Sequence, residues 1–254
     1  MAEVSRRNFV KGAAVGAATL GTGALLAACS APAPKATETP KADTAKPEYT
    51  AEVLSPTAAA EAGKGSNFDI VPESKTVVGT TYENLMSAIT GETGATTKYE
   101  AFAKAAEKDG FQQLNRLFTA TAAAEKIHIG LEYDLAKKMK PETEKPTPPA
   151  VEAHESDINL ILAAQGEIYE TSDMYPSFIK KAKDEGENEA VAVFTRAKLA
   201  EAYHAERYLD AYSTIDHPSD AKYYLCPICG YIHKGENFTN CPICLAPKDS
   251  FTAF

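Results

Sequence analysis

The chain has 254 residues, with 35 acidic and 26 basic side chains and a net charge of −9. This balance argues against a nucleic-acid partner, because binding to phosphates depends on clustered Lys and Arg. The length allows one or two domains with a sizeable core. Of the five cysteines, four lie close to the C-terminus and one, Cys29, stands alone.

The N-terminal segment resembles an export signal. Arg6 and Arg7 are followed by Phe9 and by an apolar run that is too short and too rich in Gly for a membrane span. This pattern resembles a twin-arginine signal, and Leu26-Ala27-Ala28-Cys29 resembles a lipoprotein cleavage box. Residues 1–29 are therefore predicted to be a signal, although an ordinary signal peptide with a generic cleavage site stays open. We expect a protein exported to the cell envelope and anchored to a membrane only through lipidated Cys29, facing the periplasm or the cell exterior.

Residues 30–75 are rich in Pro, Ala, Thr and Lys. Such a segment buries too little apolar surface to offset its chain entropy, so we predict a disordered tether. The twin-arginine route carries folded proteins. The resemblance to its signals therefore implies that any cofactor is loaded before export.

Residues 76–216 are predicted to fold as a four-helix bundle. Apolar residues recur at helical spacing in four stretches, near 80–108, 110–139, 156–185 and 187–215. The Pro-rich segment from Pro141 to Pro149 is long for a bundle loop, which suits a crossover between parallel helices. The expected fold class is mainly α, a four-helix bundle with a long crossover.

Acidic residues lie on the apolar faces of all four predicted helices, and two of them begin a Glu-x-x-His unit. A buried, unpaired carboxylate costs several kcal/mol, and no Lys or Arg lies on these faces to compensate. Two metal ions would solve this problem, and carboxylate with imidazole suits iron or manganese, with zinc as a third choice. For any single Glu, a solvated helix face stays open. The candidate ligands are Glu92, Glu125, His128, Glu167, Glu170, Glu201 and His204.

Residues 217–254 contain two Cys-x-x-Cys units, Cys226 to Cys229 and Cys241 to Cys244. Two such units together complete a tetrahedral four-sulfur metal site, in which iron and zinc are alternatives. Gly230 can follow the first unit in a left-handed conformation and let backbone N–H groups face the sulfur atoms. A pair of disulfides and a structural zinc ribbon stay open.

These motifs together resemble the rubrerythrin family over residues 80–254. The cysteine units and the run from Ala246 to Phe251 are similar to rubredoxin, although Leu245 stands where rubredoxins often have Gly. In the bundle the resemblance rests on Gly91-Glu92, the Glu125 to His128 unit, Gly166 to Glu170, Met174-Tyr175-Pro176 and the Glu201 to His204 unit.

The resemblance implies a ferritin-like bundle with a non-haem di-iron site that reduces hydrogen peroxide to water. A rubredoxin-like iron, with zinc as an alternative metal, would pass electrons to that site. Glu92 would be a terminal ligand of the first iron, Glu125 and Glu201 would bridge the irons, and Glu167 and His204 would complete the second. Glu170 and His128 would compete for the first iron, with carboxylate bound when oxidised and imidazole when reduced. Tyr99 and Tyr175 would orient carboxylates through hydrogen bonds, and Pro176 would bend its helix at a cost of about 3 kcal/mol.

The resemblance also implies partners. In the family the small domain of one subunit lies against the bundle of another, so we expect a homodimer or larger oligomer and an unidentified electron donor. Two other functions stay open. One is an iron-oxidising or iron-handling protein that uses oxygen, and the other is a non-enzymatic electron carrier or zinc-filled structural protein.

Overall fold

The computed structural model describes residues 74 and 76–254. The predicted signal, with Cys29, and the predicted tether apart from Ser74 lie outside the described residues. Among the residues that the structure describes, no helix is both long and apolar enough to cross a membrane.

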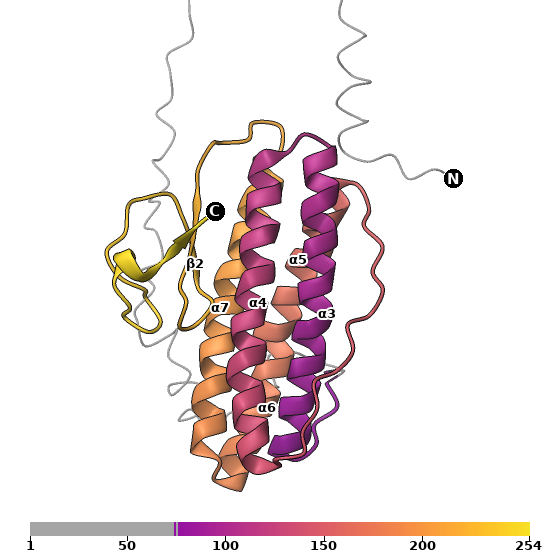
Figure 1. The fold of residues 1–254 in the computed structure, drawn as a ribbon, viewed down its shortest axis with the longest axis vertical. Coiled ribbons are helices and arrows are strands. Elements are labelled where there is room, and N and C mark those ends of the chain that lie inside the picture. The colour runs from indigo at the N-terminus through magenta and orange to yellow at the C-terminus, as the bar shows by residue number, and fades with distance from the viewer. Residues whose placement is uncertain (1–73, 75) are drawn as a thin grey trace, which may run out of the picture. The chain divides into compact units, whose positions relative to one another are not determined.

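The described chain forms the expected four-helix bundle (Figure 1). A capping box between Thr80 and Glu83 opens the first helix. In Figure 1, α4 and α5 run in the same direction, and residues 140–155 return along the side of the bundle, so the predicted crossover is confirmed. The helices are α3 (Thr81–Lys108), α4 (Gln112–Met139), α5 (Ser156–Tyr169), α6 (Tyr175–Glu185) and α7 (Asn188–Ser213).

The third predicted helix differs from the expectation, because a π-helix, η2 (Glu170–Met174), separates α5 from α6. The N–H of Tyr175 donates to Glu170 O, five residues back. Pro176 has no N–H, and it falls in the first turn of α6, where a donor is not needed. One π turn, a feature common at functional sites, therefore lies directly before Pro176, and the bend expected there stays a prediction.

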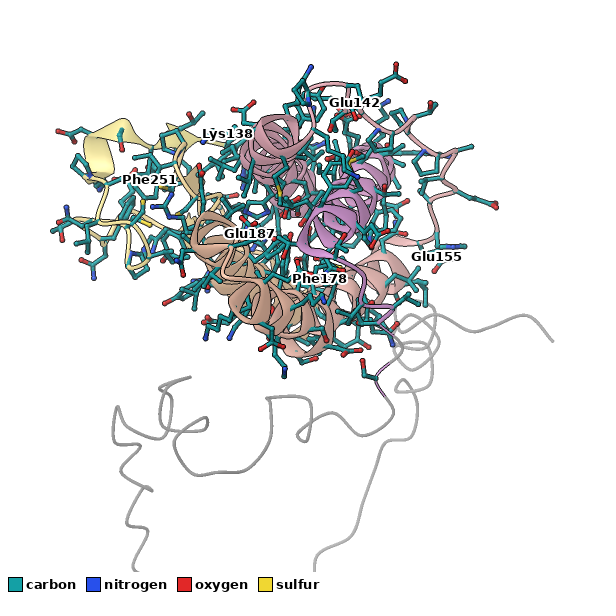
Figure 2. The ribbon with its side chains drawn as sticks, turned by 90° about the horizontal axis from the view of Figure 1, so that it is seen from below. Lys138, Glu142, Glu155, Phe178, Glu187 and Phe251 are labelled. Carbon is teal, nitrogen blue, oxygen red and sulfur yellow. The ribbon has the colours of Figure 1, made fainter. Side chains whose placement is uncertain are left out.

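Two apolar clusters fill the bundle at different heights. One is built around Tyr99, Phe102 and Phe118, and the other around Tyr175 and Phe178. Figure 2 looks along the helices and shows Phe178 in the interior between them. Burial of these faces is the main favourable term in folding.

The C-terminal residues form a small antiparallel sheet beside the bundle (Figure 1). Its strands are β1 (Tyr223–Leu225), β2 (Ile232–Lys234) and β3 (Thr252–Ala253), in the order β2-β1-β3, and a 3₁₀ turn, η3 (Lys248–Ser250), precedes β3. Tyr223, Leu225 and Ile232 join the same apolar cluster as Phe118 of α4. In this chain the small domain packs on the bundle of the same chain. The contact with another subunit that the resemblance implies stays a prediction.

Leu245 occupies the left-handed region with φ 64°, and it is the one non-glycine residue of the described chain with a positive φ. It closes the second cysteine unit as Gly230, with φ 76°, closes the first. In both units the N–H of this residue donates to the carbonyl of the first cysteine. The Leu side chain is 74% exposed, so little burial compensates for the strained backbone.

A Leu245→Asn variant is expected to be more stable by up to about 1 kcal/mol, since Asn tolerates the left-handed region. Chemical denaturation of the metal-loaded protein measures the gain. Ile228→Asn is the control, because it removes an exposed apolar side chain of the same domain from an ordinary backbone position. Equal effects of the two substitutions would contradict the strain at Leu245.

Candidate metal centres

Two groups of carboxylate and imidazole side chains meet inside the bundle. In each group, one ligand atom per residue lies within 4.8 Å of the others. Glu125 and Glu201 belong to both groups, so they are placed to bridge two ions. The groups are Glu92, Glu125, His128 and Glu201, and Glu125, Glu167, Glu201 and His204.

The groups lie between the two apolar clusters and are sealed from solvent. The side chains of Glu92, Glu125, Glu167, Glu201 and His204 are completely buried. The helices α3 and α5 each contribute one Glu to this layer of carboxyl groups, and α4 and α7 each contribute one Glu-x-x-His unit, as the sequence predicted.

Tyrosines from two helices fix the outer carboxylates. Tyr99 Oη donates to Glu167 Oε1, and Tyr175 Oη donates to Glu92 Oε1. The two tyrosines come from the two different apolar clusters, so they approach the acid layer from opposite sides. Such hydrogen bonds orient metal-binding carboxylates.

Backbone carbonyls of the small domain set the tautomers of both histidines. His128 Nε2 lies 3.1 Å from Cys229 O, and His204 Nε2 lies 2.8 Å from Gly230 O. A carbonyl oxygen only accepts hydrogen bonds, so each Nε2 must carry the proton and donate. In a neutral ring, Nδ1 then turns a lone pair toward the carboxylates.

The carboxylate oxygens and Nδ1 atoms at the centre of the cluster are arranged for metal ions and not for hydrogen bonds to one another. His128 Nδ1 lies 2.7 Å from Glu201 Oε1, and His204 Nδ1 lies 2.7 Å from Glu201 Oε2. Both oxygens of Glu125 and of Glu201, and both Nδ1 atoms, are buried without a hydrogen bond. Lone pairs that face each other at such distances repel unless a cation or a proton lies between them, and the donor set is one that iron or manganese accepts.

The pKa values show how the cluster behaves without metal. Burial raises the pKa of Glu167 from 4.5 to about 8, and burial with the neighbouring carboxylates raises that of Glu92 well above its ordinary value. Burial opposes charge on His128, yet Glu201 and Glu125 raise its pKa well above 6.5. Burial also opposes ionisation of Glu201, but His128 and His204 hold its pKa well below its usual range. Protons thus fill the metal-free site.

Glu170 is the one candidate ligand in the bundle that stands outside both groups. It is the first residue of the π-helix and is 9% exposed, whereas the other carboxylates are fully buried. Burial and the charge of Glu167 raise the pKa of Glu170, while Lys98 acts in the opposite direction. The structure therefore shows His128 within the first group and Glu170 beside it.

The sequence reasoning missed Glu132. Glu132 is fully buried in α4, although the apolar residue before it, Leu131, is only half-buried. Glu132 Oε1 lies 2.9 Å from Tyr175 Oη. The available signal was spacing, because Glu132 follows Glu125 by seven residues and therefore shares its helix face.

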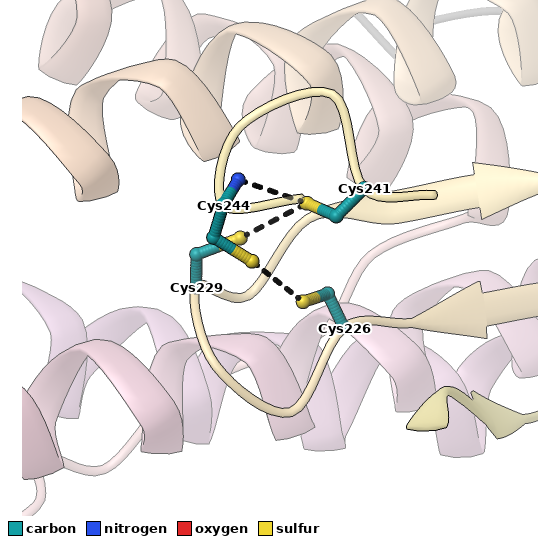
Figure 3. A group of neighbouring side chains, drawn as sticks. All are labelled: Cys226, Cys229, Cys241 and Cys244. Carbon is teal, nitrogen blue, oxygen red and sulfur yellow. Dashed lines mark hydrogen bonds between the residues drawn. The ribbon is translucent and has the colours of Figure 1, made fainter. Parts of the chain in front are cut away.

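The four C-terminal cysteines form the third group (Figure 3). Their sulfur atoms lie 3.4 Å apart in the pairs Cys226–Cys244 and Cys229–Cys241, and all four thiols are free. The N–H groups of Ile243 and Cys244 donate to Cys241 Sγ. A hydrogen bond from Cys229 lowers the pKa of Cys226 to about 5, which favours the thiolate that a metal binds.

Gly230 lies where the two kinds of site meet. A Cβ atom on this residue would fall 2.3 Å from His128 Nε2, so no side chain fits. The close approach is what allows the carbonyls of Cys229 and Gly230 to reach the histidines.

Known proteins share this arrangement. The family model of rubrerythrin matches residues 83–212, and that of the rubrerythrin rubredoxin-like domain matches residues 224–252. The chain is 65% identical over 189 residues to nigerythrin from Nitratidesulfovibrio vulgaris, covering 74% of this chain and 94% of that protein. The chain belongs to the rubrerythrin family.

A second relative and a solved structure show the same similarity. The rubrerythrin of Nitratidesulfovibrio vulgaris is 34% identical over 177 residues, covering 67% of this chain and 92% of that protein. A structure of nigerythrin in its fully reduced, all-ferrous state matches with a TM-score of 0.72 and 64% identity, covering 76% of this chain and 95% of that one.

A Gly230→Ala variant is expected to lose more stability than Gly235→Ala. Both residues have a positive φ, 76° and 84°, so both variants carry about 1–2 kcal/mol of backbone strain. Only at Gly230 does the new Cβ meet a neighbour, since nothing lies within 4 Å at Gly235. Denaturation curves of the two variants measure the difference, and equal losses would contradict the tight contact with His128.

The metal-free protein is expected to lose stability as the pH rises from about 5 to 8. The raised pKa of Glu167, about 8 against 4.5, means that the folded state keeps a proton which the unfolded chain releases in this window. The raised pKa of His128 acts in the same direction above 6.5. Bound metal displaces these protons, so the loaded protein should not show the decline.

Thermal unfolding at several pH values, with and without metal, measures this effect. A Glu167→Gln variant should weaken the decline in the metal-free protein, because the titrating group is removed. A metal-free protein that gains stability over the same window would show that protons do not fill the cluster.

Proposed function

We propose that this chain is a peroxidase that reduces hydrogen peroxide to water at two iron ions in the bundle, with electrons delivered through an iron on the four cysteines. One observation carries the proposal. The backbone carbonyls of Cys229 and Gly230 accept hydrogen bonds from His128 and His204, one histidine of each metal group.

This contact supports redox chemistry over storage. Cys229 supplies a sulfur to the four-cysteine group, and its own carbonyl is one 3.1 Å hydrogen bond away from His128. A bonded path of this kind couples a one-electron carrier directly to the buried site. A storage protein has no need of such a carrier.

The chain's own residues divide the work of binding. Glu125 and Glu201 belong to both groups and would bridge the ions, and Glu92 and Glu167 would each hold one ion from outside. When bound, a pair of ferrous ions supplies the two electrons that peroxide reduction requires. The seal around the carboxylates keeps bulk water from them.

Glu170 and His128 are proposed to exchange at the first iron. His128 lies within the first group in this structure, and Glu170, which is 9% exposed, stands outside that group, as expected for the reduced arrangement. The anionic carboxylate suits ferric iron, and the neutral imidazole suits ferrous iron. Because Glu170 begins the π-helix, its backbone lies in a segment that departs from the regular helical ladder.

The deciding experiment measures the metal content and visible spectrum of the full chain and then mixes the reduced protein with peroxide. We expect iron in all three ligand groups, a ferric four-sulfur spectrum that bleaches on reduction, and rapid return of colour with peroxide. Zinc on the cysteines would contradict electron delivery by that centre. Reduced protein that reacts with oxygen but not with peroxide would favour iron oxidation instead.

A Cys244→Ser variant separates electron delivery from peroxide chemistry. Steady-state peroxide consumption with an external reductant should fall to background. A single oxidation of the chemically reduced bundle by peroxide should proceed at the rate of the unchanged protein. Cys29→Ser is the matched control, since it makes the same substitution outside the four-cysteine group.

The remaining expectations stay proposals. Export by the twin-arginine route, lipidation of Cys29 and a place in the cell envelope concern residues outside the described part of the chain. A homodimer or larger oligomer and an electron donor outside the cytoplasm are proposed with them.

A further inference from the structure

Glu132 is a buried carboxyl group that the metal groups do not use. Its side chain is completely buried, and it belongs to none of the three ligand groups of the described residues. Oε1 lies 2.9 Å from Tyr175 Oη, and Oε2 makes no hydrogen bond. A buried ionised carboxylate with a single neutral partner is costly, so this group needs a role or a proton.

Counting hydrogens at Tyr175 assigns that proton. Tyr175 Oη contacts Glu92 Oε1 and also Glu132 Oε1, but a phenol has one hydrogen to donate. If both carboxyl groups were ionised, one contact would set two oxygens against each other with no hydrogen between them. One carboxyl group must therefore be protonated and donate to Tyr175 Oη.

The metal groups decide which of the two it is. Glu92 belongs to the first metal group, where a bound cation would hold it as the anion, while Glu132 belongs to none of the groups. The proton therefore resides on Glu132, and the hydrogen bonds point in one direction, from Glu132 to Tyr175 and from Tyr175 to Glu92.

We propose that Glu132 and Tyr175 form a proton relay that ends at Glu92 and serves the first metal position. The relay rests on the proposed peroxidase function, in which hydrogen peroxide takes up two electrons and two protons to give two waters. The O–H bond of Glu132 breaks as its proton moves to Tyr175 Oη, and the phenolic proton moves to Glu92 and on to a peroxide oxygen. The relay supplies one of the two protons, and water would supply the second. Two ferrous ions held by the bundle would supply the electrons, and Glu132 would take up a proton from water before the next turnover.

The other half of the bundle has no carboxyl group at the position that corresponds to Glu132. Glu132 follows Glu125 by seven residues, and the residue seven after Glu201 is Tyr208. The Tyr208 ring lies 5.5 Å from the Tyr99 ring, so an aromatic side chain stands where α4 has a carboxyl group. A purely structural clamp would serve both halves equally, whereas a relay is needed only where peroxide is protonated.

The test compares Glu132→Gln with Glu132→Leu in the full, metal-loaded chain. Gln keeps the size and an N–H donor for Tyr175 but has no transferable proton, and Leu removes both. We expect oxidation of the reduced protein by peroxide to slow about 100-fold in both variants, the lower end of what a positioned acid contributes. Tyr208→Phe is the matched control and should react like the unchanged protein.

An infrared spectrum of the loaded protein tests the proton itself. The carbonyl stretch of a protonated carboxyl group should be present at rest and absent in Glu132→Gln. Glu132→Gln that reacts at the original rate, with only Glu132→Leu slowed, would overturn the relay in favour of simple positioning of Tyr175. Absence of the infrared band from the unchanged protein would overturn it too. If the unchanged protein ignores peroxide, the peroxidase proposal fails, and the infrared band still decides where the proton lies.

Discussion

The structure depends on one constraint, that several carboxyl groups share a dry layer in the middle of a helical bundle. Glu125 and Glu201 are fully buried, and none of their oxygens has a hydrogen bond of good geometry. Apolar clusters close the layer above and below. Cations or protons must therefore occupy it, and the same layer that weakens the empty bundle becomes a strong ligand set when metal is present.

The second constraint links this layer to the small domain. Because carbonyl oxygens cannot donate, the contacts of Cys229 O and Gly230 O force both histidines to present Nδ1 to the carboxylates. The position of the four-cysteine domain thus orients the ligands of the bundle, and in the proposed function it would also provide a path for electrons. The missing side chain of Gly230 is what permits the approach, since a Cβ would overlap His128.

The helices and most of the site could be predicted from the sequence, because both depend on local spacing. Glu-x-x-His puts two ligands on one helix face, and an acid on an apolar stripe stands out against its neighbours. Glu132 did not stand out, because its neighbour Leu131 matched the apolar pattern and a lone Glu is common on helix surfaces. The π turn before Tyr175 and the packing of the small domain on its own bundle were also out of reach, since long-range contacts determine them.

The two halves of the bundle repeat one pattern, and their differences locate the chemistry. Glu125 and Glu201 each begin a Glu-x-x-His unit, and Tyr175 and Tyr99 each donate to an outer carboxylate. The repeat fails where α4 has Glu132 and α7 has Tyr208 at the equivalent position. It fails again at Glu170, for which the first helix has no counterpart, since Ala95 stands three residues after Glu92. The burial of Glu132 beside Tyr175, which donates to Glu92, places the first difference near the position that Glu92 and His128 would hold. Glu170 raises the pKa of Glu92, and Glu167 raises that of Glu170, so the second difference lies close to outer carboxylates of both groups. A symmetric scaffold would bind two ions equally well. In the proposed function, the added acids are what distinguish a reacting position from a holding one.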